Sequence, residues 1–156
     1  MRLQVATRLA LYAILQLASD PRRQFAAAEI AERFGISANH LAKVLRTLGR
    51  AGLVEALRGA GGGYRFRGNA RRVTLLEVIE LFEDVGPGAN GDREPGAGSS
   101  EGRALGRVTE EIDDIARATV GSITLATMLR LVEEQRREAA KPASEPTARA
   151  VGQRRR

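Results

Sequence analysis

Apolar residues in the first fifty positions recur at intervals of three and four, which is the spacing of one face of an α-helix. The first stretch predicts a helix over 2–18 that stops at Ser19-Asp20-Pro21. A second stretch predicts a short helix over 26–34. A third apolar stripe predicts another helix that ends before Gly52, and its members are Leu41, Val44, Leu45 and Leu48.

The residues between the second and third predicted helices are those of a tight turn. Gly35 stands where a left-handed C-terminal cap belongs, Ile36 is a candidate for burial in the turn, and Ser37 is a good N-cap. A helix, such a turn and a second capped helix form the pattern of a helix-turn-helix.

After Gly52 the pattern changes to two short strands around a glycine-rich loop. Residues 53–57 predict one strand, 58–63 a flexible turn, and 64–67 a second strand in which apolar and basic residues alternate. Two strands that directly follow a helix-turn-helix make a wing. Thr74 then caps a predicted helix that runs to about Asp84.

The remaining chain predicts two more helices and two unpacked segments. Six glycines and two prolines make residues 85–102 a flexible loop. A long amphipathic helix begins near Arg103 and breaks at Gly121, where Ser122 can cap a last helix. The residues on the apolar side of the long helix are Leu105, Val108, Ile112, Ile115 and Thr119, whereas Glu110, Glu111, Asp113 and Asp114 are expected to face water. We therefore expect a mainly α fold with a winged domain over 1–84, the loop over 85–102, helices over 103–136, and a disordered basic tail over 137–156.

The composition excludes most kinds of catalytic site. The 156 residues include no cysteine, which excludes disulfides, thiolate nucleophiles and thiolate-bound metals, and a single histidine excludes multi-histidine sites. The net charge of +6 is unevenly spread: residues 1–72 hold 13 basic and 4 acidic residues, residues 73–135 hold 5 and 13, and residues 136–156 hold 7 and 2. The basic first half predicts a polyanion-binding unit, whereas a chance distribution plus a basic tail is the alternative.

No segment predicts membrane insertion. The most apolar run, Leu9–Ala18, spans ten residues and contains Gln16, so it is too short to cross a bilayer. Its helical periodicity and the lack of a small-residue cleavage site argue against a signal peptide. We expect a cytoplasmic protein.

The third predicted helix carries the candidate DNA contacts. If its apolar stripe faces the core, Asn39 and Lys43 point outward in the first two turns, where they can reach adenine and guanine edges. Arg46 and Arg50 are placed for phosphates, as is the helix N-terminus at Ser37. His40 either bonds a phosphate or base or faces water. The wing adds Arg58, suited to a minor groove, together with the backbone of Gly61 and Gly62.

Two rival interpretations have little support. A nucleotide cradle at Gly59–Gly63 lacks both the G-x-G-x-x-G spacing and a Walker lysine, and a strand rather than a helix follows it. Asp113 and Asp114 are adjacent on a helix and do not face each other, so they indicate a solvated face rather than an acid–base pair. Nothing in the sequence indicates an enzyme, and no metal site is expected.

At these residues the chain resembles the Rrf-two (BadM) family of winged-helix transcriptional regulators, over about residues 1–135. The Ser-x-Asn-His-Leu start of the recognition helix is most similar to the nitric-oxide-sensing NsrR branch. The matching segments are Met1-Arg2-Leu3, Glu29 to Ser37, Asn39-His40-Leu41, Lys43-Val44, Ala51 to Val54, the wing from Arg58 to Tyr64, Thr74 to Ile79, and Ser122 to Leu125.

The resemblance implies a homodimer, held by the long helix, on a palindromic operator in double-stranded DNA. Many members bind an iron–sulfur cluster through three cysteines in the loop before that helix, and in the NsrR branch an aspartate near the partner's N-terminus completes the site. This chain has no cysteine, and Arg8 stands at the aspartate position. We therefore expect no cluster and no other cofactor.

The resulting hypothesis is a sequence-specific, dimeric repressor without a cluster. The alternative is an architectural or partner-dependent DNA-binding module whose acidic half docks another protein. A small-molecule effector, a protein effector, phosphorylation and constitutive binding all remain open, and a small molecule is expected between the winged domain and the dimer helices.

Overall fold

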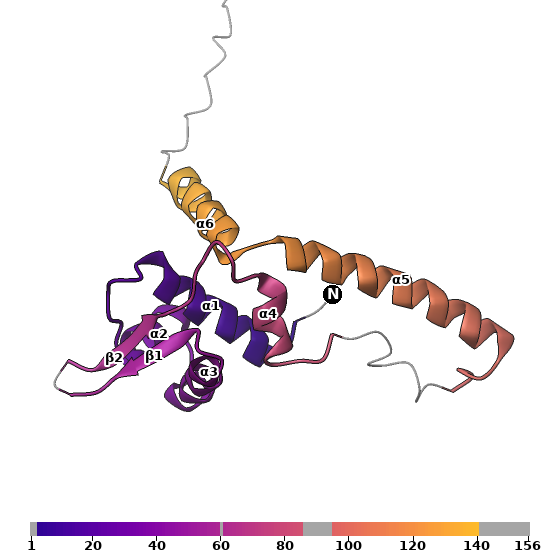
Figure 1. Ribbon diagram of the computed structural model, residues 1–156, viewed down its shortest axis with the longest axis horizontal. Coiled ribbons are helices and arrows are strands. Elements are labelled where there is room, and N and C mark those ends of the chain that lie inside the picture. Colours follow the sequence, from indigo (N-terminus) through magenta and orange to yellow (C-terminus); the bar gives the residue numbers. More distant parts are fainter. Residues whose placement is uncertain (1–2, 60, 86–94, 141–156) are drawn as a thin grey trace, which may run out of the picture.

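The computed structural model describes residues 3–59, 61–85 and 95–140 (Figure 1). The described chain is mainly helical with one small sheet, and it confirms the expected winged helix-turn-helix with a long helix after it. Its elements are α1 (Val5–Ser19), α2 (Ala27–Phe34), α3 (Ala38–Arg50), β1 (Val54–Leu57), β2 (Gly63–Phe66), α4 (Leu75–Glu80), α5 (Ser100–Ser122) and α6 (Leu125–Ala139).

Helices α1, α2 and α3 enclose the core. The buried face of α1 includes Ala10, Ala13, Ile14 and Leu17, and α3 packs against it through its predicted apolar stripe, which is buried throughout. Gly35 ends α2 with a φ of 61°, a left-handed conformation that glycine adopts without steric cost. The Ser37 hydroxyl accepts a hydrogen bond from the His40 amide at 3.3 Å. Both turn signals in the sequence are thus confirmed.

The wing is an antiparallel pair in which Val54 lies opposite Phe66 and Leu57 opposite Gly63. A third segment that the sequence did not reveal joins this sheet: Phe25 forms an isolated antiparallel bridge with Tyr64. A Cβ at Gly63 would overlap with the Phe25 carbonyl, so this close approach of backbones requires glycine. The bridge fixes the base of the wing to the segment just before α2.

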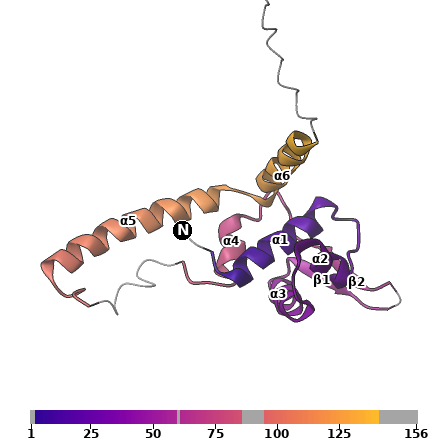
Figure 2. The same ribbon diagram turned by 180° about the vertical axis from the view of Figure 1, so that it is seen from behind.

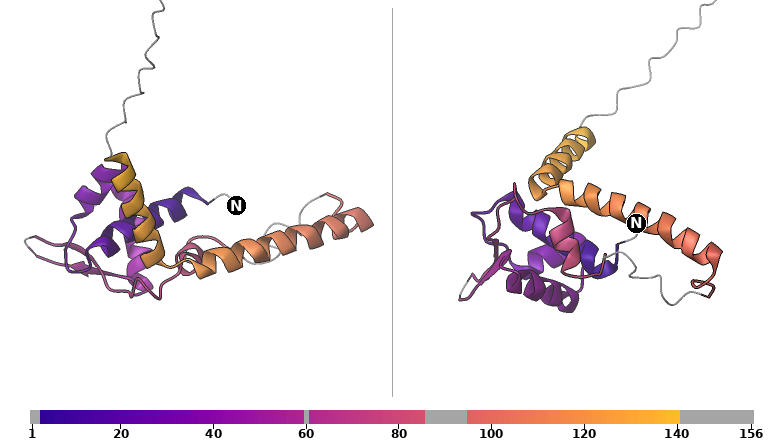
Figure 3. Two further views of the ribbon diagram at one scale, coloured as in Figure 1. Left: turned by 90° about the horizontal axis from the view of Figure 1, so that it is seen from above. Right: turned by 45° about the vertical axis from the view of Figure 1, so that its right-hand side comes forward.

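Helix α5 extends away from the winged domain on the side opposite to the wing tip (Figures 1 and 2). Helix α6 turns back and packs against α1 (Figure 3). The turn between them is anchored to the domain because Thr74 and Thr124 form a β-bridge and the Leu125 amide donates to the Val73 carbonyl. None of the described helices has the length and apolar character needed to cross a membrane.

Several predicted boundaries were wrong. Helix α4 ends at Glu80 instead of continuing to Asp84, and α5 begins at Ser100 because Ser99 caps it. Gly121 lies inside α5, and the N-cap of α6 is Thr124, whose hydroxyl accepts from the Thr127 amide, rather than Ser122. Helix α6 continues through the first residues assigned to the tail. The rest of that predicted tail, and residues 86–94 of the predicted loop, lie outside the described residues.

Candidate nucleic-acid interface

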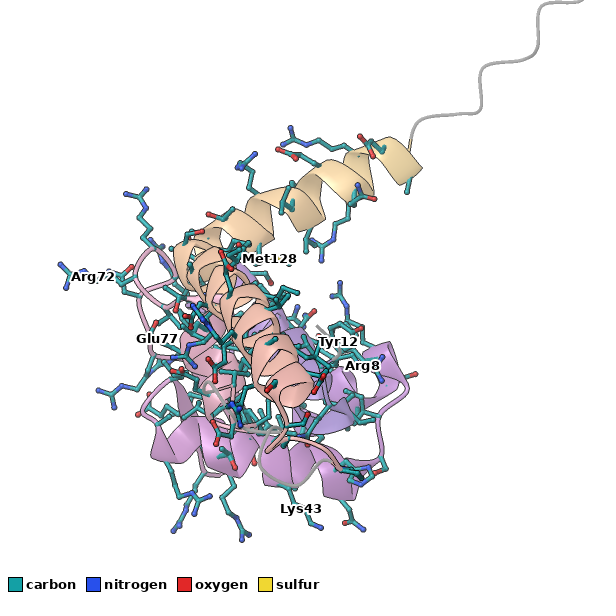
Figure 4. All side chains as sticks on the ribbon, turned by 90° about the vertical axis from the view of Figure 1, so that its right-hand side faces the viewer. Arg8, Tyr12, Lys43, Arg72, Glu77 and Met128 are labelled. Atoms are coloured by element: carbon teal, nitrogen blue, oxygen red, sulfur yellow. The ribbon has the colours of Figure 1, made fainter. Side chains whose placement is uncertain are left out.

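One face of α3 is exposed and carries the predicted DNA-contacting residues. Opposite its buried stripe, all of the long polar side chains are exposed, and Figure 4 shows Lys43 directed away from the rest of the molecule. These exposed residues are Asn39, His40, Lys43, Arg46 and Arg50. The structure therefore brings the five predicted residues of this helix together on one surface.

The N-terminus of α3 is suited to an anion. Its first turn contains no acidic residue, so the partial positive charge of the helix end is not offset by a carboxylate of its own. Ser37 is exposed, and its hydroxyl bonds only one of the free amides, that of His40. The remaining first-turn N–H groups point out of the helix end, which is the geometry in which proteins bind phosphate.

A shallow groove runs between α3 and the wing. It has a volume of about 270 Å³, and Arg46 from α3 and Tyr64 from β2 line its two sides. Tyr64 is half-buried and bridged to Phe25, so it packs at the base of the wing. The groove joins the recognition face to the wing into one continuous surface.

The wing loop places Arg58 at the exposed end of β1. Gly61 is exposed with a φ of 84°, and the Gln24 amide donates to its carbonyl oxygen. Gly62 lies so close to the Leu57 carbonyl that a Cβ would overlap with it. The two glycines thus shape the loop, while Arg58 is the charged group that it presents.

Two further arginines of the wing were not singled out from the sequence. Arg65 and Arg67 point to the same carboxylate, with Glu55 at 2.9 Å from the Arg65 guanidinium and 3.6 Å from that of Arg67. The hydrogen bond from Arg65 lowers the pKa of Glu55 below its ordinary value. The alternation of basic residues in the second strand was the available signal, because it places both arginines on the solvent side of β2.

A match to the model of the Rrf2 family, described as iron-dependent transcriptional regulators, covers residues 3–131. The chain is 49% identical over 142 residues to the HTH-type transcriptional regulator BadM of Rhodopseudomonas palustris, covering 88% of this chain and 87% of that protein. Among solved structures, IscR of T. potens superposes with a TM-score of 0.70 at 26% identity, covering 92% of this chain and 94% of IscR.

A second structural relative shows the same fold at lower identity. CymR, the global cysteine regulator of B. subtilis, superposes with a TM-score of 0.70 at 22% identity, covering 84% of this chain and 98% of CymR. The family match spans both the winged domain and α5, so it includes every element that forms the exposed basic surface. This chain belongs to the Rrf2 family and is a DNA-binding transcriptional regulator.

Proposed function

We propose that the protein is a sequence-specific repressor that acts as a homodimer on a palindromic operator, without an iron–sulfur cluster. The observation that carries the proposal is the pairing of an exposed basic recognition face on α3 with an unpartnered apolar stripe on α5. The first surface suits DNA, and the second suits a copy of the same helix.

Each residue of the interface has a distinct role in this proposal. Asn39 and Lys43, in the first two turns of α3, contact base edges in the major groove. The remaining cations act on the backbone: Arg46 and Arg50 hold phosphates, and the helix end at Ser37 holds another. Arg58 enters the adjacent minor groove from the wing. His40 contributes a hydrogen bond to the same backbone.

The dimer follows from the exposed stripe of α5. Leu105, Val108, Ile112 and Ile115 are each more than half exposed, and in the described chain no other element covers them. Pairing α5 with its copy buries the stripe and leaves the wings at the outer ends of the dimer, because each wing lies opposite its own α5. Two recognition helices would then enter successive major grooves, about 34 Å apart.

The residues of this chain do not fit the cluster that the family's description suggests. The chain contains no thiolate, and its only histidine, His40, lies exposed on α3. In the described residues, no three His, Asp or Glu side chains gather as a metal site. We therefore assign no step of regulation to iron bound by cysteines.

The proposal is tested by selecting binding sites from a random pool of DNA with the full chain. We expect a palindrome with half-sites one helical turn apart, bound with a steep dependence on salt. Asn39→Ala and Lys43→Ala should reduce discrimination against single base changes, whereas Arg50→Ala should weaken all sites equally. Equal affinity for every sequence would refute the proposal and favour the architectural module. A reporter downstream of the selected site should be repressed, and activation would refute the repressor assignment.

A further inference from the structure

A groove on the face of the molecule away from α3 has the character of a ligand site. It lies where α1, α2 and α6 meet, and it has a volume of about 240 Å³. Figure 3 shows α6 lying against this end of the domain. The walls are apolar side chains from all three helices, namely Leu15, Phe34, Leu129 and Val132.

The groove is also lined by a polar side chain, that of Gln16. Gln16 is only 7% exposed, and its side-chain amide has no hydrogen-bond partner in the described part of the chain. Its backbone carbonyl is engaged, because it accepts from the Ser19 hydroxyl at 2.7 Å. Among the described residues, only the Thr7 hydroxyl is a fully buried polar side-chain atom without a partner, so the Gln16 amide opens into the groove, where it is free to donate to a polar ligand atom.

The rim of the groove carries an excess of positive charge. Arg136 lies 3.6 Å from Glu133, so these two lining charges offset one another. Arg33 has no ion pair in the described chain and rests over the Phe34 ring at 5.4 Å. Tyr12 stacks on the same ring with centroids 5.4 Å apart, which gives the groove a flat aromatic side. An unpaired guanidinium above an apolar wall suits an amphipathic anion.

We propose that this groove binds a small organic carboxylate with an apolar body of about six to eight carbon atoms, and that the bound molecule regulates DNA binding. A cavity of about 150 Å³ accepts benzene, so the larger volume here accommodates a ring with a short acidic arm. The donors of Arg33 and Gln16 bind the acid end, while the walls from α1, α2 and α6 hold the apolar body. The proposed regulation of DNA binding rests on the proposed function of the protein, whereas the proposed binding of a carboxylate in the groove does not.

Binding is tested on the full chain without DNA, by calorimetric titration with phenylacetate, hexanoate and the neutral analogue phenylacetamide. We expect one carboxylate per protomer, with phenylacetamide at least about tenfold weaker. Arg33→Gln and Gln16→Leu should each weaken phenylacetate by about tenfold. Arg22→Gln is the matched control, because Arg22 is exposed but does not line the groove. The affinity of this variant for phenylacetate should stay within about twofold of that of the wild type.

Several results would overturn the site. The site would be refuted if phenylacetate showed no saturable binding, or if Arg33→Gln bound it as tightly as the wild type does. It would also be refuted if Arg22→Gln lost as much affinity for phenylacetate as Arg33→Gln, because this would indicate general charge attraction. Gln16→Leu replaces a side chain of similar size whose amide makes no hydrogen bond within the described chain, so it should unfold at about the same temperature as the wild type. A loss of binding in this variant would then not reflect misfolding. Concentration-dependent NMR shifts in the groove without ligand would show that a second copy of the chain fills it, and would also overturn the site.

The regulatory half is tested separately by measuring affinity for the selected DNA site with saturating phenylacetate. We expect a change of at least about fivefold in the wild type and none in Gln16→Leu. Binding of phenylacetate with unchanged DNA affinity would overturn the regulation alone. If the protein failed to bind DNA specifically, the titration without DNA would still test the ligand site.

Discussion

If α5 forms the proposed dimer, replacing Ile112 and Ile115 of this helix with serine should convert the dimer into a monomer. The four large apolar side chains of the stripe, Leu105, Val108, Ile112 and Ile115, are between 55% and 62% exposed in the single chain. Complete burial of such a side chain contributes about 1.5–3 kcal/mol, so burying the exposed remainder contributes about 1–2 kcal/mol each. Over eight side chains in two protomers, this amounts to about 8–16 kcal/mol.

Association itself costs about 4–15 kcal/mol in lost freedom and side-chain ordering, so the dimer depends on nearly the whole stripe. The double substitution removes four of the eight side chains, or about 4–8 kcal/mol. The dissociation constant should therefore rise by at least about a thousandfold. Sedimentation equilibrium over a wide range of protein concentrations measures this change directly.

A matched control lies on the opposite face of the same helix. Glu110 and Asp114 are exposed and point away from the stripe, so their replacement with serine should leave the dimer unchanged. Far-UV circular dichroism should be the same for both double variants, because neither pair of side chains belongs to the protomer core. A dimer as tight as the wild type after Ile112→Ser and Ile115→Ser would refute the assignment of this face.

Two further predictions concern charge at the wing and burial in α1. Glu55→Gln releases Arg65 and Arg67 from their shared carboxylate, so DNA should bind more tightly at low salt. In fluorescence anisotropy titrations, the slope of log affinity against log salt concentration should steepen by about 1–2. An unchanged slope would show that these arginines do not reach phosphates. Thr7→Val should raise the free energy of unfolding by about 1 kcal/mol in urea titrations, because the buried Thr7 hydroxyl has no hydrogen-bond partner in the described chain. A loss of stability would instead show that the hydroxyl is satisfied.

The sequence predicted the helix-turn-helix well because its signals are local. Gly35, Ser37 and the apolar stripe of α3 each specify a conformation through neighbours within four residues. The bridge from Phe25 to Tyr64 was missed because it joins segments 39 positions apart and involves one residue on each side. The anchor at Thr124 was missed for the same reason, since the partner that fixes this cap position lies at Thr74.

The recognition face also depends on local signals, whereas the α1–α6 groove depends on contacts between distant segments. The exposed residues of α3 follow from periodicity, because burying one stripe of a single helix determines what faces outward. The groove needs α1 and α6 side by side, and no pattern within either helix specifies that contact. Gln16 is informative in retrospect: a polar residue within the apolar run Leu9–Ala18 marks either an edge of the buried face or a place where something polar is bound.

The position of α1 determines how a ligand in that groove could act on DNA. Helix α1 packs against α3 on one side and α6 on another, and the residues between them are close-packed aliphatic side chains such as Ile14 and Leu17. Close-packed cores transmit displacement as rigid units and resist reshaping. A ligand that shifts α6 relative to α1 would therefore leave α3 intact and move the whole winged domain relative to α5. In a dimer joined through α5, that movement changes the separation of the two recognition helices. DNA sites with one base pair inserted between the half-sites should consequently respond to phenylacetate by a different factor than the selected site, and an identical response would argue against this movement.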